Sequence, residues 1–133
     1  MSKVLVDSSI WISYFKTGKY AKALEDLMDS NHICVNDVIL AELCPSILHK
    51  KERDLNKLLL SIHNAPLNID WQRIISMQTL NLRNGLNKVG IPDLVIAQNT
   101  ADSRLLLFSE DKHFQAMSSL HGFNLYEPIT FHR

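Results

Sequence analysis

The sequence has few cysteines and no long apolar run. Its two cysteines, Cys34 and Cys44, stand ten residues apart without a CxxC pattern. This argues against a zinc knuckle and is typical of reduced thiols in a cytosolic protein. The apolar run near the amino terminus is shorter than that of a signal peptide, and no run approaches the length of a membrane span. We therefore expect a cytoplasmic protein that is not bound to a membrane.

The sequence also lacks net charge. Its 14 basic and 14 acidic residues cancel, which argues against a protein that coats nucleic acid through a general basic field and against an acidic disordered tail. No repeat, low-complexity stretch or linker interrupts the 133 residues, a length at which one domain buries a sizeable core. We expect a single domain over residues 1–133.

Short apolar segments alternate with segments of helical periodicity. Strands are expected at 4–6, 33–35, 105–108 and 124–126, with a weak edge strand at 66–69. Helices are expected at 10–15, 20–28, 37–43, 50–62, 71–82, 93–103 and 112–117. Asn36 or Asp37 is expected to cap the third helix, Pro45 to bend or end it, and Asp70 to cap the fifth. The alternation predicts an α/β fold with a mostly parallel central sheet of about four or five strands and helices on both faces.

Three acidic positions are expected at one edge of this sheet. Asp7 follows the first strand, and Asp111, with Glu110 beside it, follows the last long apolar strand. Ligands of open α/β sheets bind outside the carboxyl ends of the strands, so these acids point to the same edge. Asp93 begins a helix near that edge. Each of these acids could also be a plain helix cap.

Glu42 lies within an apolar helical segment. Its neighbours one turn earlier are Val38 and Ile39, so its carboxylate is expected to share a face with core residues. A carboxylate among apolar neighbours needs a partner, and no lysine or arginine stands three or four residues away. A structural salt bridge to a distant residue and a functional role are both open.

Carboxylates that converge repel one another, and the pKa of at least one rises strongly unless a cation neutralises the cluster. A hard divalent ion is the natural neutraliser, because Mg²⁺ combines a few carboxylates with waters and substrate phosphates. Such a site polarises a phosphodiester and activates a water for in-line attack. No cluster of histidines or cysteines competes for a softer metal. His113 either approaches this edge beside Asp111 or lies at the surface.

Four segments stand out together: Val4 to Ile12 (VLVDSSIWI), Ala41 to Leu43 (AEL), Ile91 to Ala97 (IPDLVIA) and Leu107 to Phe114 (LFSEDKHF). Their acids are separated by 35, 51 and 18 residues. In this order and at this spacing, the segments resemble the sequence blocks of PIN-domain ribonucleases, particularly the VapC-type toxins of bacterial and archaeal toxin–antitoxin pairs. The resemblance spans nearly the whole chain.

The resemblance implies a single PIN-like domain that acts as a metal-dependent endoribonuclease. Asp7, Glu42 and Asp93 would form the acidic triad that holds Mg²⁺ or Mn²⁺, and Asp111 would be the fourth acid. Glu110 could fill the fourth place instead. We favour Asp111 because its spacing to the phenylalanine that follows matches the family.

The resemblance also implies roles for residues around the acids. Ser8 or Ser9 would orient Asp7 or a metal-bound water, and Ser109 stands where the family often has a serine or threonine beside the acids. Arg83 and Lys88 precede a catalytic acid, and we expect them to contact phosphates of the RNA substrate.

Partners implied by the resemblance are RNA, a second copy in a homodimer, and a VapB-like antitoxin. In many members the antitoxin lays an apolar helix on the toxin and directs a basic side chain toward the acids. The groove for it is expected between the helices at 10–15 and 20–28. Its expected anchors are Trp11, Tyr14, Phe15 and Leu27. The aromatic residues among them could instead belong to the core.

The sequence offers less support for two alternatives without nuclease activity. A PIN-like domain that only binds a partner would not need intact acids, and here all four are present. A receiver-like signalling domain would want an acidic pair after the first strand, but Ser8 and Ser9 follow Asp7. Ser9 also argues against a haloacid-dehalogenase-like phosphatase, whose second aspartate would stand at that position.

Overall fold

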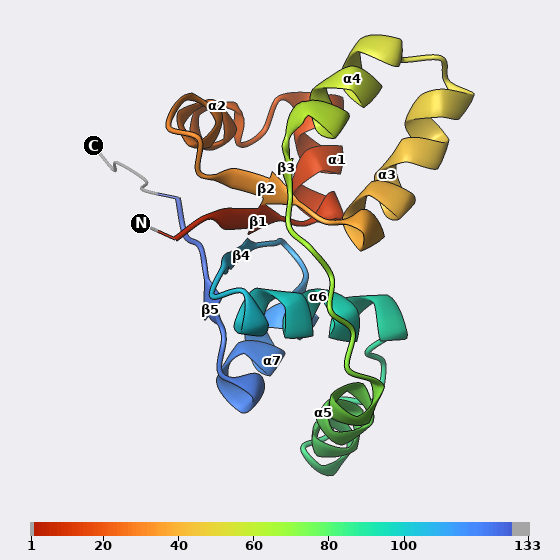
Figure 1. The fold of residues 1–133 in the computed structure, drawn as a ribbon, viewed down its shortest axis with the longest axis vertical. Coiled ribbons are helices and arrows are strands. Elements are labelled where there is room, and N and C mark those ends of the chain that lie inside the picture. The colour runs from red at the N-terminus through yellow and green to blue at the C-terminus, as the bar shows by residue number, and fades with distance from the viewer. Residues whose placement is uncertain (1, 129–133) are drawn as a thin grey trace.

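The computed structural model describes residues 2–128 of the chain, in which five strands form one sheet in the order β3-β2-β1-β4-β5 (Figure 1). The strands are β1 (Val4–Val6), β2 (Ile33–Val35), β3 (His63–Asn64), β4 (Leu106–Phe108) and β5 (Asn124–Leu125). The helices are α1 (Ser8–Thr17), α2 (Ala21–Asp29), α3 (Asp37–His49), α4 (Arg53–Ser61), α5 (Trp71–Arg83), α6 (Ile91–Asp102) and α7 (Lys112–His121).

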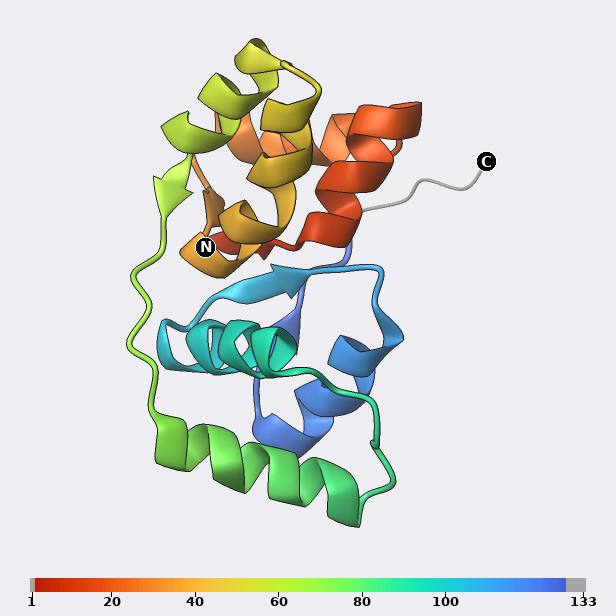
Figure 2. The same ribbon diagram turned by 90° about the vertical axis from the view of Figure 1, so that its right-hand side faces the viewer.

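Every pair of neighbouring strands in this sheet is parallel. Helices α1 to α4 lie on one face and α5 to α7 on the other, as the two views show (Figure 1 and Figure 2). The central strand β1 is fully buried at Val4, Leu5 and Val6, because the side chains on both of its faces meet helices. The expected α/β fold is confirmed, and among the described residues the sheet is parallel throughout.

Local capping signals place the starts of two helices correctly. The Asn36 side chain accepts a hydrogen bond from the backbone N–H of Ile39 at 2.9 Å, at the start of α3. The Asp70 side chain accepts one from the backbone N–H of Arg73 at 3.1 Å, at the start of α5. Each cap satisfies a backbone donor that the first turn of a helix leaves without a partner.

The end of α3 and the start of α4 differ from expectation. Helix α3 continues through Pro45 to His49, although proline lacks an N–H group and crowds the preceding turn. Buried Ile47 lies beyond the proline and anchors the last turn in the core, so tertiary packing outweighs the local signal. The helix expected from residue 50 begins only at Arg53, because Lys51 adopts a left-handed φ of 58°.

The expected edge strand at 66–69 is wrong. The edge strand on this side of the sheet is β3, which pairs with β2 at Cys34 and Val35. The segment after it is extended but is held by side-chain amides of α6 rather than by a neighbouring strand. The Asn99 side chain donates to the carbonyl of Pro66 at 2.9 Å, and the Gln98 side chain donates to that of Asn68 at 2.9 Å.

Both cysteines are free thiols, Cys34 buried and Cys44 half-buried. Burial raises the pKa of the Cys34 thiol to about 12, which is typical of an unreactive core cysteine. Among the described residues, no helix combines the length and apolar character that crossing a membrane requires.

Candidate active site

The structure brings the four expected acids to the carboxyl edge of the sheet. Asp7 joins β1 to α1, and Asp111 is the N-cap of α7 just beyond β4. Glu42 projects from α3, and Asp93 lies in the first turn of α6. The carboxylates lie close enough to influence one another: Asp7 and Asp93 both raise the pKa of Glu42. Four segments that are remote in sequence thus supply one acidic site.

Asp7 is the most enclosed of these acids, with 5% of its surface exposed. Two hydroxyl groups donate to its Oδ2 atom, from Ser9 at 2.9 Å and from Ser109 at 2.8 Å. The two hydrogen bonds hold the carboxylate in one orientation. The expectation that Ser8 or Ser9 orients Asp7 is therefore met by Ser9. No hydrogen bond from the Ser8 side chain is seen within residues 2–128.

Glu42 differs from expectation because it does not share the core face of α3. Its side chain is exposed, while its neighbour Leu43 is buried. Partial shielding of its carboxyl end from water, together with the charges of Asp7 and Asp93, raises its pKa to about 7. No ion pair to Glu42 is found among the described residues. The structural salt bridge considered for this residue is therefore not observed there.

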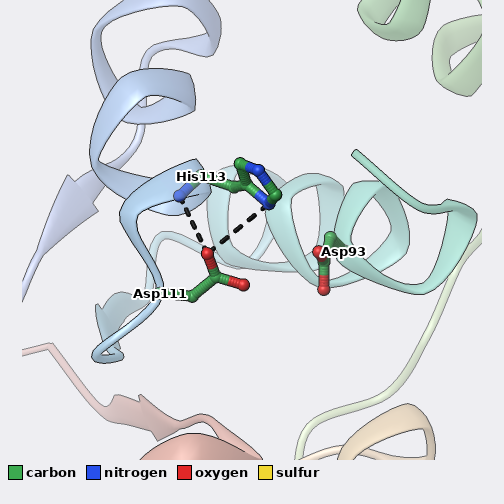
Figure 3. A group of neighbouring side chains, drawn as sticks. All are labelled: Asp93, Asp111 and His113. Atoms are coloured by element: carbon green, nitrogen blue, oxygen red, sulfur yellow. Dashed lines mark hydrogen bonds and ion pairs between the residues drawn. The ribbon is translucent and has the colours of Figure 1, made fainter. Parts of the chain in front are cut away.

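Asp93 and Asp111 face each other across the start of α7, with His113 beside them (Figure 3). One ligand atom from each of the three side chains lies within 4.8 Å of the others. Partial burial raises the pKa of Asp93, and the charges of Asp111 and Asp7 add to this, whereas His113 opposes it. His113 thus reaches the acidic edge, which the sequence pattern left open.

Glu110 points to a different neighbourhood from Asp111. Its carboxylate accepts a hydrogen bond from Ser13 at 2.8 Å and lies 3.8 Å from the amine of Lys19. The hydrogen bond from Ser13, followed by one involving Tyr20, lowers the pKa of Glu110. Only its backbone N–H touches the acid site, where it donates to Ser9. The geometry favours Asp111 over Glu110 as the fourth acid.

The residues expected to contact RNA are exposed. Arg83 is the last residue of α5, and Lys88 lies in the loop between α5 and α6. Neither forms an ion pair within the described part of the chain. Both charges are therefore available to a ligand, while no contact links either of them to the acids.

Two of the expected antitoxin anchors lie in the core. Trp11 is completely buried, and its indole N–H donates to the carbonyl of Val6 at 3.2 Å; Leu27 is 3% exposed. Tyr14 and Phe15 are half-buried. Trp11 therefore belongs to the core, as the alternative interpretation expects, whereas part of the Phe15 side chain remains exposed to solvent.

A groove of about 190 Å³ borders the acid site between α1 and α3, whereas the antitoxin groove expected from the sequence would lie between α1 and α2. The apolar stripe of α2 packs in the core through Leu24 and Leu27, so these two side chains offer little surface to a partner. The groove is lined by Ile12, Phe15, Lys16, Glu42, Leu43, Ser46, Ile47, Lys50 and Glu52. The spacing of Ile12, Phe15 and Lys16 on one helical face is the only sequence signal for it.

Comparison with known proteins identifies the family. The sequence profile of the PIN domain matches residues 4–120, so the chain belongs to the PIN domain family. PIN domains are nucleases that typically use divalent metal ions. No curated protein matches the sequence.

Several solved structures share the fold. VapBC2 from Rickettsia felis, bound to a DNA fragment from its promoter, has a TM-score of 0.68 at 19% identity and covers 92% of this chain and 96% of that one. DNA-bound VapBC from Salmonella typhimurium has a TM-score of 0.67 at 17% identity, with coverages of 95% and 98%. FitAcB from Neisseria gonorrhoeae has a TM-score of 0.68 at 14% identity, with coverages of 93% and 96%.

Proposed function

We propose that this PIN domain is a metal-dependent endoribonuclease and the toxin of a VapC-type toxin–antitoxin pair. The observation that carries the proposal is the convergence of Asp7, Glu42, Asp93 and Asp111 at the carboxyl edge of the sheet in a member of a nuclease family. The acids come from four separate segments, so a helix-capping role for each one does not account for their common location.

The donor set fits a hard divalent cation. All four acids offer carboxylate oxygens, which Mg²⁺ and Mn²⁺ accept as ligands. The pKa of Glu42, raised to about 7, indicates that the cluster does not carry its full negative charge without a cation. We assign Asp7, Glu42, Asp93 and Asp111 as the residues that hold Mg²⁺ or Mn²⁺.

The protein's own contribution is to place these oxygens before the substrate arrives. Ser9 and Ser109 fix the Asp7 carboxylate, and the first turn of α6 presents Asp93 toward the same edge. A bound divalent ion supplies polarisation of the scissile phosphodiester and a lowered pKa for the attacking water. Arg83 and Lys88 are proposed to contact phosphates on either side of the cut.

The groove between α1 and α3 supports the proposal that this domain binds a protein partner. Its apolar surface includes Ile12 and Phe15, and one wall ends at Glu42. We propose that an apolar helix of a VapB-like antitoxin packs on this surface and directs a basic side chain toward the acids. This places Phe15 and half-buried Tyr14 near the partner and leaves Trp11 in the core.

A homodimer is the assembly that the family resemblance implies. Helix α5 exposes large apolar side chains, with Trp71 57%, Ile75 58% and Leu82 56% exposed. They recur along one side of the helix, a pattern that normally packs against another surface. We propose α5 as a contact between copies; sedimentation of the wild type and of a Trp71→Lys, Ile75→Lys variant tests it.

The function is tested with protein purified free of antitoxin. Structured RNA is incubated with the wild type and with Asp7→Asn and Asp93→Asn, in Mg²⁺ or Mn²⁺, and the products are mapped. The control is Asp29→Asn, an exposed acid on α2 away from the site. Cleavage is expected from the wild type and the control alone. Equal cleavage by all four proteins contradicts the assignment of the acids.

A further inference from the structure

His113 has no role in the four-acid site described so far, yet it lies against it. Its Nδ1 atom is 3.5 Å from Oδ1 of Asp111, and its ring, Asp111 and Asp93 point toward one another (Figure 3). One ligand atom from each residue falls within 4.8 Å of the others. The three side chains thus enclose a common point.

The start of α7 holds two of these side chains in place. The Asp111 carboxylate accepts a hydrogen bond from the backbone N–H of His113 at 2.9 Å, and the Asp111 N–H donates to the hydroxyl of Ser109 at 3.0 Å. The next residue, Phe114, is 1% exposed and anchors the first turn in the core. The position of His113 in the first turn of α7 is therefore fixed by the Asp111 cap before it and by the buried Phe114 after it.

We propose that His113 is a nitrogen ligand of the divalent ion held by Asp93 and Asp111, and that it makes this position prefer Mn²⁺ to Mg²⁺. The inference rests on the proposed metal-dependent function and adds to it a residue and a metal preference. His113 would add one imidazole beside Asp93 and Asp111, which are two of the four carboxylates assigned to the metal site.

The distances suit ligands of one ion. Two atoms bound at about 2.1 Å to an octahedral ion lie about 3.0 Å apart when adjacent and about 4.2 Å apart when opposite. The 3.5 Å between His113 and Asp111 falls between these values. One ligand atom from each of the three side chains lies within 4.8 Å of the others, so the group is compact enough to contact one ion.

The chemistry of the donor set supplies the preference. Mg²⁺ strongly favours oxygen ligands and keeps several waters, so an imidazole adds little to its binding. Carboxylates suit Mg²⁺ and Mn²⁺ alike, but Mn²⁺ is a first-row transition ion and accepts a nitrogen ligand more readily than Mg²⁺ does, although less strongly than Fe²⁺, Ni²⁺, Cu²⁺ or Zn²⁺. A site with both kinds of donor therefore gains affinity for Mn²⁺ without gaining affinity for Mg²⁺.

The test measures Mn²⁺ binding without RNA. Free Mn²⁺ is followed by electron paramagnetic resonance during titration of the purified protein, and Mg²⁺ affinity is measured by competition. Electron spin echo modulation then reports whether a nitrogen is bound to the ion. The variants are His113→Ala and His113→Gln. The control is His63→Ala, because His63 is an exposed histidine on the edge strand β3, which carries none of the four acids.

For the wild type and the control, we expect saturable Mn²⁺ binding with ¹⁴N modulation. Both His113 variants should lose the modulation, and His113→Ala should bind Mn²⁺ about ten-fold more weakly. Its Mg²⁺ affinity should change less than about two-fold. His113→Gln offers an amide oxygen in place of the nitrogen, so it should reduce the preference for Mn²⁺ while keeping Mg²⁺ binding. Circular dichroism verifies that each variant is folded.

Two results overturn the proposal, and they are distinct. Saturable Mn²⁺ binding without nitrogen modulation, unchanged in His113→Ala, shows that His113 only bonds to Asp111; the metal-dependent function then stands. Absence of saturable Mn²⁺ binding in the wild type removes the metal site and the proposed nuclease mechanism together.

Discussion

Asp7 and Glu42 lie at the same acidic edge but differ in burial and in the hydrogen bonds that they receive. Asp7 is nearly enclosed and receives two hydroxyl hydrogen bonds, from Ser9 and Ser109. Glu42 is more exposed, has no hydrogen-bond donor among the described residues, and has a pKa raised to about 7. The contrast teaches that hydroxyl donors hold the Asp7 carboxylate in one orientation, whereas Glu42 has no such donor among the described residues and its pKa is raised by partial burial and by the neighbouring acids. The fold therefore orients Asp7, whereas Glu42 is expected to become fully ionised near neutral pH when a cation binds beside it.

The largest expected effect separates the two acids in catalysis. Asp7→Asn should lower RNA cleavage by about a hundred-fold or more, because it removes a charge that the fold holds rigidly at the centre of the site. Glu42→Gln should cost less, since its carboxylate is already partly protonated near neutral pH without metal. Single-turnover rates near neutral pH at a fixed, subsaturating Mn²⁺ concentration measure both. A larger loss of cleavage for Glu42→Gln than for Asp7→Asn would contradict this ranking of the two acids.

A smaller effect concerns the donors to Asp7. Ser9→Ala and Ser109→Ala each remove one hydrogen bond from a buried carboxylate, and we expect each to lower the free energy of unfolding by about 1–3 kcal/mol. The two serines share one acceptor, so their effects should not add. Urea unfolding of the single and double variants measures this. Additive effects would show that the hydroxyls act separately.

The dependence of stability on pH tests the Glu42 side of the comparison. Without metal, the folded protein binds a proton at Glu42 up to about pH 7, whereas the unfolded chain releases it near pH 4.5. The free energy of unfolding should therefore fall as the pH rises from about 4.5 through 7. The raised pKa of Asp93 acts in the same direction.

Urea unfolding across this pH range measures the fall, which is modest because solvent screens an exposed side chain. Glu42→Gln and saturating Mg²⁺ should each flatten it. A slope that is the same in all three conditions would mean that Glu42 titrates normally.

The smallest expected effect is at Ser8, next to the serine that bonds Asp7. Its side chain makes no hydrogen bond within the described residues, so Ser8→Ala should change the free energy of unfolding by less than about 0.5 kcal/mol. Cleavage should be unchanged within about two-fold. Thermal melts and initial rates compare it with Ser9→Ala. Equal effects of the two substitutions would show that Ser8 also supports Asp7.

Much of the fold could be read from local signals. The run Val4–Val6 was recognisable as a strand buried on both faces because it is uniformly apolar, and Asn36 and Asp70 were recognisable as caps. The prediction that Pro45 bends or ends its helix also rests on a local signal. The helix continues because Ile47, beyond the proline, packs in the core, and local sequence does not reveal that packing. The strand expected at 66–69 failed because side chains of a distant helix hold that segment.

For the candidate site, the sequence alone determines which acids follow strands or begin helices. This places Asp7, Asp93 and Asp111 at one edge, since parallel strands share their carboxyl ends. Only the tertiary structure shows that Ser9 bonds to Asp7, that Asp111 lies beside Asp93, and that a groove lies between α1 and α3. These arrangements depend on contacts between distant segments, such as Ser109 with Asp7 and Glu110 with Ser13. Local periodicity carries no information about such contacts.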